Sequence, residues 1–175
     1  MHAIEQTAVH TKNQNMLKKT KQQNWQVGDL FVVQTKDGKC VIGQIVGQET
    51  EVLNSASVAF FDRRSDSNSP SFEIGSISEN EAFAVLFATR DQLDSGEWKV
   101  ISHHRLLVSD KMRPYENLRN NGWVGAKVIG SANINEFLNA FYALCPWDDW
   151  KDPSYLDRFL ISPEKKPLNV VYKNQ

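Results

Sequence analysis

The chain has 175 residues, of which 41% are hydrophobic and 23% charged, a composition typical of a globular protein with a buried core. The formal net charge is −1, which argues against general nucleic-acid binding because that activity needs a strong basic surplus. The N-terminus has no apolar signal-peptide region and the longest apolar run, residues 82–88, is too short to cross a bilayer, so the sequence predicts a cytoplasmic protein without a membrane partner.

Residues 1–24 form a polar leader rich in Lys, Gln, Asn and Thr. With few apolar side chains to bury, this leader is predicted to be flexible or loosely docked. Its lysines leave a second interpretation open, a basic arm for an acidic partner. Trp25 is predicted to begin the packed part of the chain, which gives one domain over residues 25–175.

Three β-rich runs follow Trp25. Residues 29–34 carry apolar side chains on both faces, which favours a central or covered strand, and residues 39–46 are its predicted partner. Asp37-Gly38 between them is a strong hairpin signal, interpreted as a type I′ turn. Gly43 in mid-strand predicts a bulge or a close backbone approach. Residues 57–62 are predicted to form a third strand.

The polar stretch 63–71 is predicted to be a loop, because it is rich in turn formers and has no apolar side chain. It begins with Arg63 and Arg64, which are interpreted either as solvated side chains or as part of a partner-binding surface. Further strands are predicted at 83–89 and 98–102, with a turn or one helical turn between them at 91–96.

The clearest helix lies in the C-terminal half. Its apolar face consists of Ile134, Phe137, Leu138, Phe141 and Leu144. Ser131 or Asn133 is predicted to cap it, and it is expected to end before Pro146. Residues 110–121 look irregular, whereas 123–129 and 168–173 are predicted strands and 155–160 a short helical turn. The predicted fold class is therefore mostly β or α+β, with a bent antiparallel, barrel-like sheet and one main helix packed on it.

No catalytic signature, nucleotide-binding loop or metal-ligand spacing is present in the sequence. His103 and His104 are adjacent in a predicted strand, so their side chains are expected on opposite faces and cannot easily share a metal ion. Cys40 and Cys145 are interpreted as reduced thiols. We therefore predict a protein that is not an enzyme and needs neither a metal nor another cofactor.

The most unusual polar stretch combines two tryptophans with three acidic residues. It consists of Trp147, Asp148, Asp149, Trp150 and Asp152. One interpretation is that the tryptophans pack under the end of the helix while the aspartates are solvated. The alternative is a partner-binding patch, since tryptophan supplies contact area and aspartate complements a basic partner.

Several short segments of the chain resemble the immunity protein 26 family. They are Val27-Gly28-Asp29-Leu30-Phe31, Asp37-Gly38-Lys39, Gly43-Gln44-Ile45, Val58-Ala59-Phe60-Phe61-Asp62 and Trp98-Lys99-Val100-Ile101. Members are small, mostly-β bacterial proteins encoded beside polymorphic or contact-dependent toxins. The resemblance implies a protein that binds and neutralises a cognate protein toxin. The sequence departs from the family pattern at Gln34-Thr35 and at Gln44.

Three other functional classes remain as alternatives. A small-barrel nucleic-acid-binding module would need a basic aromatic face, and the lysine cluster of this chain lies in the leader. A hydrolase would need a nucleophile and base, or a metal set, converging in a cleft. An interaction domain for a partner other than a toxin is the third possibility.

Overall fold

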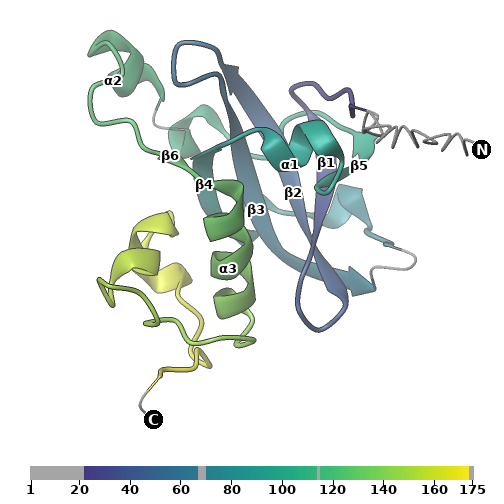
Figure 1. The fold of residues 1–175 in the computed structure, drawn as a ribbon. Coiled ribbons are helices and arrows are strands. Elements are labelled where there is room, and N and C mark those ends of the chain that lie inside the picture. The colour runs from purple at the N-terminus through teal and green to yellow at the C-terminus, as the bar shows by residue number, and fades with distance from the viewer. Residues whose placement is uncertain (1–21, 67–69, 114, 174–175) are drawn as a thin grey trace, which may run out of the picture.

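The computed structural model describes residues 22–66, 70–113 and 115–173. Across these residues the strands form one six-stranded sheet in the order β5-β1-β2-β3-β4-β6 (Figure 1). The strands are β1 (Asp29–Gln34), β2 (Lys39–Glu49), β3 (Ser55–Asp66), β4 (Ala82–Ala88), β5 (Lys99–His103) and β6 (Val128–Ile129). Neighbouring strands are antiparallel, except that β6 pairs with β4 in parallel.

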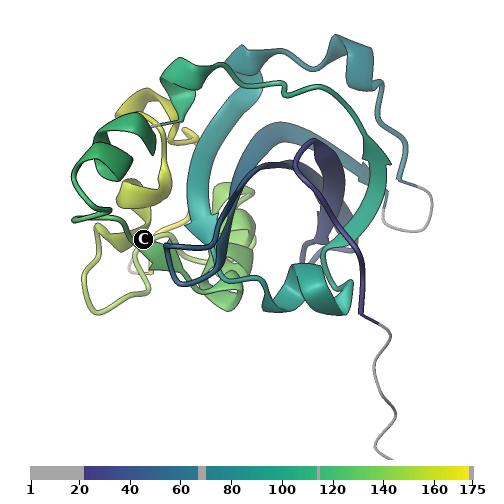
Figure 2. The same cartoon turned by 90° about the horizontal axis from the view of Figure 1, so that it is seen from above.

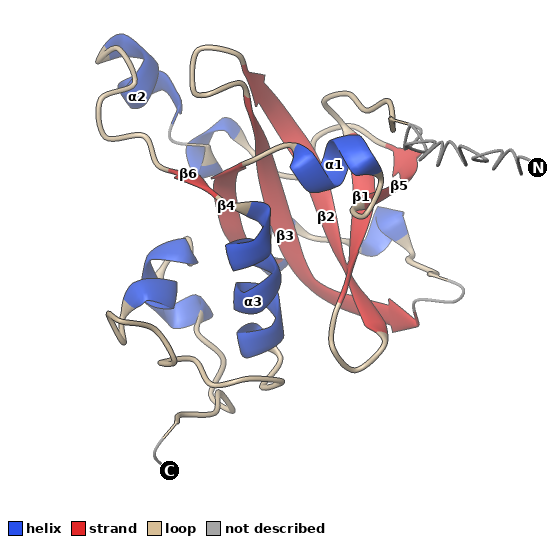
Figure 3. Cartoon of the chain, in the orientation of Figure 1, coloured by secondary structure: helices blue, strands red, loops and turns tan. Residues whose placement is uncertain are grey.

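One helix dominates the helical part of the described chain (Figure 3). It is α3 (Ser131–Phe141). The shorter helices are α1 (Asp91–Ser95) and α2 (Tyr115–Asn120), and the 3-10 turns are η1 (Ile74–Ser76), η2 (Glu79–Glu81), η3 (Asp110–Met112), η4 (Tyr155–Phe159) and η5 (Pro163–Lys165). This arrangement confirms the α+β class and the single main helix. The barrel-like part of the prediction is not supported, because the sheet is open and its end strands β5 and β6 do not pair.

The β1–β2 hairpin has the predicted register but a different turn. The backbone N–H of Thr35 donates to Lys39 O at 2.8 Å, which leaves a three-residue loop, and positive φ occurs there only at Gly38 (80°). A type I′ turn needs positive φ at both central residues, so that prediction was wrong. A three-residue loop with one left-handed glycine fits a type I turn followed by a bulge, and it explains why the glycine is required.

Gly43 has the role that its position in mid-strand predicted. The pairing of β2 with β3 shifts register between Val41 and Gly43, and the ring of Phe31 lies over the glycine. A Cβ at position 43 would lie 2.5 Å from Phe31 Cζ, so only glycine leaves room for the ring. Phe31 in turn stacks on Trp98 with ring centroids 5.3 Å apart, which places this contact in the middle of the core.

The sheet is buried on both faces, which explains why β1 to β4 are apolar on both sides. One face packs against α3 and the C-terminal residues through Phe60, Phe83, Phe137 and Trp147. The other is covered by residues 72–77, 106–113 and 115–123. Figure 2 shows the η1–η2 connection and α3 on opposite sides of the sheet.

Several predicted boundaries need correction. β3 continues to Asp66, because Lys39 to Val41 of β2 still pair with it, so residues 63–66 are strand and not loop. Residues 67–69 of that predicted loop lie outside the described part of the chain. Only Val128–Ile129 of the predicted 123–129 strand is a strand, and α2 occupies part of the stretch predicted to be irregular. The 168–173 strand is wrong, since only Val171 forms an isolated bridge, to Pro146.

The start of α3 also differs from the prediction. Gly130 is the N-cap, and no side chain caps the helix. The Ser131 hydroxyl donates instead to Asp91 Oδ2 at 2.7 Å, and Asn133 Nδ2 lies 3.4 Å from the Tyr155 hydroxyl. Tertiary partners have therefore taken the two side chains that the local pattern assigned to capping.

The predicted leader lies mostly outside the description, since residues 1–21 are not described. Gln23, at its end, is already packed. Its amide nitrogen donates to the carbonyls of Leu93 and Trp98 at 2.8 and 2.9 Å, and its amide oxygen accepts from Val100 N at 2.9 Å. Ordered contacts thus begin at least two residues before Trp25.

Candidate functional site

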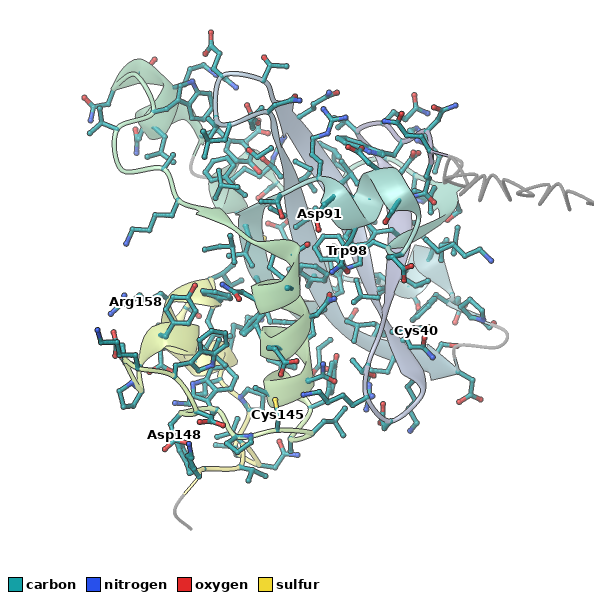
Figure 4. All side chains as sticks on the ribbon, viewed as in Figure 1. Cys40, Asp91, Trp98, Cys145, Asp148 and Arg158 are labelled. Atoms are coloured by element: carbon teal, nitrogen blue, oxygen red, sulfur yellow. The ribbon has the colours of Figure 1, made fainter. Side chains whose placement is uncertain are left out.

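A C-terminal segment, residues 143–173, covers the outer side of α3. Trp147, Leu156 and Phe159 are its buried anchors, and Trp147 and Phe159 both contact the ring of Phe137. Ile161 N donates to Phe83 O at 2.9 Å, which joins the segment to β4. In Figure 4, Asp148 and Arg158 of this segment lie to the left of α3 and Cys40 lies to its right. The segment thus shares the core cluster of α3 and β4 and adds a surface beside them.

Trp147 anchors the acidic-aromatic loop (residues 147–152) in the core. Its side chain is fully buried, its Nε1 donates to Asp157 Oδ1 at 2.8 Å and its backbone N–H donates to Val171 O at 2.8 Å. It therefore packs beneath the helix end, as one interpretation of the sequence expected, and offers no exposed area to a partner. Its predicted partner-binding role can only be indirect.

The three aspartates of the loop are held by groups of the same segment. Asp148 accepts from Lys173 N at 2.8 Å, and Asp149 lies 2.6 Å from Lys173 Nζ. Asp152 forms an ion pair with Arg158 and accepts a hydrogen bond from Ser154 N. The hydrogen bonds from Ser154, together with the nearby Arg158, lower the pKa of the Asp152 carboxyl. The loop is therefore tied to its own segment and locally acidic, but its charges are already partly balanced.

Trp150 is the aromatic side chain that this loop presents. It is partly buried and its ring lies over Tyr155, with centroids 4.7 Å apart. Beside it a cavity of about 260 Å³ is lined by Lys36, Glu136, Cys145, Pro146, Asp149 and Trp150. A partly exposed tryptophan held by a ring contact is the kind of side chain that dominates binding energy at protein interfaces.

Arg63 and Arg64 point to opposite faces of β3, because neighbouring side chains of a strand alternate. Arg63 pairs with Glu81 and also bonds Ser76. Arg64 pairs with Asp37, and its guanidinium lies 4.2 Å from the centroid of the Tyr142 ring. Both arginines are thus built into contacts of the domain, which differs from the solvated loop that one interpretation expected.

The structure brings Arg64, but not Arg63, to the same end of the molecule as the acidic-aromatic loop. Tyr142 follows α3 directly, lies under Arg64 and donates to Asp62 Oδ1 at 3.0 Å. Next to it Lys36 Nζ pairs with Glu136 Oε2 at 2.8 Å, and these two residues line the cavity beside Trp150. The hairpin tip, the end of α3 and the loop therefore form one continuous rim.

Acid is expected to weaken the Arg64–Asp37 contact of this rim. The Arg64 guanidinium lowers the pKa of Asp37 from its usual value near 3.8 to about 2. A lowered pKa in the folded state means that the carboxylate stabilises the fold above its unfolded pKa, and that this contribution is lost as the pH falls towards 2.

The free energy of unfolding of wild type and Asp37→Asn, measured between pH 6 and pH 2, should therefore differ most at pH 6 and converge below pH 3. A constant difference over that range would contradict this prediction. Asp66→Asn provides a control, because Asp66 is an exposed carboxylate near the same hairpin.

Sequence reasoning missed the residues that hold the loop in place. Lys173, Asp157 and Arg158 are distant in sequence from most of their partners, and no local pattern marks them. The signal that was available is compositional, since the C-terminal segment carries five acidic and five basic residues within 31 positions. Such a balance favours internal ion pairs over a uniformly acidic surface.

The histidines do not assemble a metal or catalytic centre within the described residues. His103 Nδ1 lies 2.9 Å from Asp29 Oδ1, whereas His104 Nδ1 lies 3.1 Å from Arg105 O. In the part of the chain that the structure covers, no group of three or more His, Cys, Asp or Glu is placed to hold a metal ion. Within the same part, no helix has both the length and the apolar character needed to span a membrane.

Comparison with known proteins assigns a family but no individual relative. No curated protein and no solved structure matches the chain. The sequence model described as immunity protein 26 matches residues 26–142, from the start of the domain to the residue after α3. The C-terminal segment and its acidic-aromatic loop lie beyond that match. Because the match spans more than half of the 175 residues, the chain belongs to the immunity protein 26 family.

Proposed function

We propose that the chain neutralises a cognate bacterial toxin by binding the toxin domain and occluding its active site or another essential surface. Membership of an immunity protein family is the observation that carries this proposal. The protein acts in the cytoplasm, as the sequence predicts, and binding itself inhibits the toxin, without a cofactor or a reaction on it. Residues 25–175 act as one immunity domain.

The acidic-aromatic loop is the proposed main contact. Its backbone and side chains are fixed by Trp147, Lys173 and Arg158, so little conformational entropy is lost when a partner binds. The side chains of Asp149 and Asp152 remain about half exposed. A basic toxin surface would join their ion pairs, which steers association and sets orientation. Arg64 extends the contact along the rim, whereas Arg63 belongs to a different face and makes a separate, peripheral contact.

The test is co-expression with the toxin domain encoded beside this gene. Wild type is expected to restore growth and to bind the purified toxin. Replacing Asp148, Asp149 and Asp152 together by asparagine keeps hydrogen-bond acceptors but removes three charges. At roughly 0.2–1 kcal/mol for each exposed ion pair, loss of the three charges should lower the affinity roughly 3- to 160-fold, mainly through slower association at low salt.

A matched control removes three exposed acidic residues elsewhere, with Glu51, Glu97 and Asp110 replaced by their amides. Failure of the wild-type chain to protect cells or to bind the toxin would contradict the proposed function. If the loop variant protects cells fully and associates with the toxin as fast as wild type, the loop is not part of the interface. That result would not contradict the immunity function itself.

A further inference from the structure

The outer edge of β4 is paired at two places and open between them. β6 pairs with Phe87 and Ala88, and Ile161 N donates to Phe83 O. Strand alternation turns the N–H and C=O of Val85 to the same edge as those of Phe87. No described residue forms a hydrogen bond with Val85 on that edge. The N–H and C=O of Val85 are thus free at this edge, where another extended chain can pair with them.

A cavity adjoins this free edge. It has a volume of about 410 Å³ and lies between the sheet and the C-terminal segment. Its lining consists of Val85, Leu86, Phe87, Lys127, Val128, Ile129, Tyr155, Arg158 and Phe159. Most of these side chains are aliphatic or aromatic, so the cavity suits one large apolar side chain of a segment lying along β4.

Both charged residues of the lining are cationic. Lys127 is exposed, and its side chain has no ion-pair or hydrogen-bond partner among the described residues. The side chain of Arg158 is 56% exposed and bonds Asp152 of the acidic-aromatic loop, which joins the cavity to the loop in one surface. A segment with acidic residues beside its apolar side chain complements these cations.

We propose that this β4-edge pocket binds an extended segment of the toxin, in which an apolar side chain fills the cavity and flanking acidic residues face Lys127 and Arg158. The backbone N–H and C=O of Val85 form hydrogen bonds with the backbone of that segment. This inference rests on the proposed function and adds a second contact beside the loop. The bound segment would also pair with the open part of the β4 edge.

The pocket can be tested without the toxin. The probe is the acetylated, amidated pentapeptide Glu-Val-Phe-Val-Glu, titrated into the ¹⁵N-labelled full chain. Saturable amide shifts are expected at Val85, Phe87 and Ile129, and the variant Lys127→Glu should weaken binding at least tenfold. Lys99→Glu, on the exposed β5 strand at the other edge of the sheet, is the matched control and should bind as wild type does.

A peptide with lysine in place of both glutamates should not bind. The proposal is overturned if the acidic peptide causes no saturable shifts, if it shifts amides elsewhere, or if free chains instead pair with each other through this edge in sedimentation experiments. In the co-expression assay, Lys127→Glu is expected to weaken toxin binding at least tenfold. Equal binding by Lys127→Glu would refute the pocket as a toxin contact, whereas loss of protection by wild type would refute the proposed function itself.

Discussion

Replacing Trp150 by alanine is expected to weaken the complex with the toxin by roughly 30- to 1,000-fold, corresponding to about 2–4 kcal/mol. Trp150 is the partly exposed aromatic side chain of the acidic-aromatic loop, and its tilted ring contact with Tyr155 holds its orientation before binding. Truncation removes the contact area and also the contact with Tyr155 that orders the loop. The effect should appear mostly as faster dissociation, measured by surface plasmon resonance at constant salt.

Two further variants separate binding from folding. Trp123→Ala removes another partly buried tryptophan, at the α2 side of the molecule, and should leave toxin affinity within about twofold of wild type. Trp150→Phe keeps an aromatic ring over Tyr155 and should recover most of the affinity. If Trp150→Ala and Trp123→Ala weaken binding equally, the loop has no special role, and the proposed interface is wrong.

The second large effect concerns Gln44, whose side chain is completely buried in β2. Its amide nitrogen donates to Gly28 O at 3.2 Å and to Arg105 O at 2.9 Å, and its amide oxygen accepts from Leu107 N at 2.8 Å. These bonds attach the chain after β5 to the centre of the sheet. Leucine has a similar size but cannot form them, so several backbone groups would lose their partners.

Gln44→Leu is therefore expected to lower the free energy of unfolding by roughly 2–4 kcal/mol, because each unsatisfied buried group costs about 1–3 kcal/mol. Denaturant unfolding followed by tryptophan fluorescence measures this change. Gln48→Leu, at an exposed position of the same strand, should change stability by less than about 0.5 kcal/mol. A Gln44→Leu protein as stable as Gln48→Leu would show that the buried amide does not hold the two segments together.

These residues also show how far the sequence can predict the fold. The pairing of β1 with β2, the bulge at Gly43 and the apolar face of α3 as far as Phe141 follow from local patterns, and the structure confirms them. Leu144, predicted on the same helical face, lies beyond the end of α3. The role of Gln44 does not follow, because two of its partners, Arg105 and Leu107, lie 61 and 63 residues away. A glutamine in a strand next to a bulge gives no local sign that it is buried.

The candidate site was predictable only in its composition. The sequence marks a tryptophan- and aspartate-rich stretch, but it does not distinguish Trp147, which is buried, from Trp150, which is partly exposed. It also does not reveal that Lys173 and Arg158 balance the aspartates, since these pairs form only when the C-terminal segment folds. Likewise, Arg63 and Arg64 looked like loop residues because the pairing that extends β3 comes from β2.

Hydrogen–deuterium exchange of the full chain, alone and with the toxin domain encoded beside its gene, tests the central claim most directly. The proposed interface predicts slower exchange in residues 147–160 and around Val85 and Lys127, while exchange at β5 stays unchanged. Slower exchange confined to β5 and α1, or a complex that leaves the C-terminal segment exchanging as in the free protein, would contradict the claim that this segment binds the toxin.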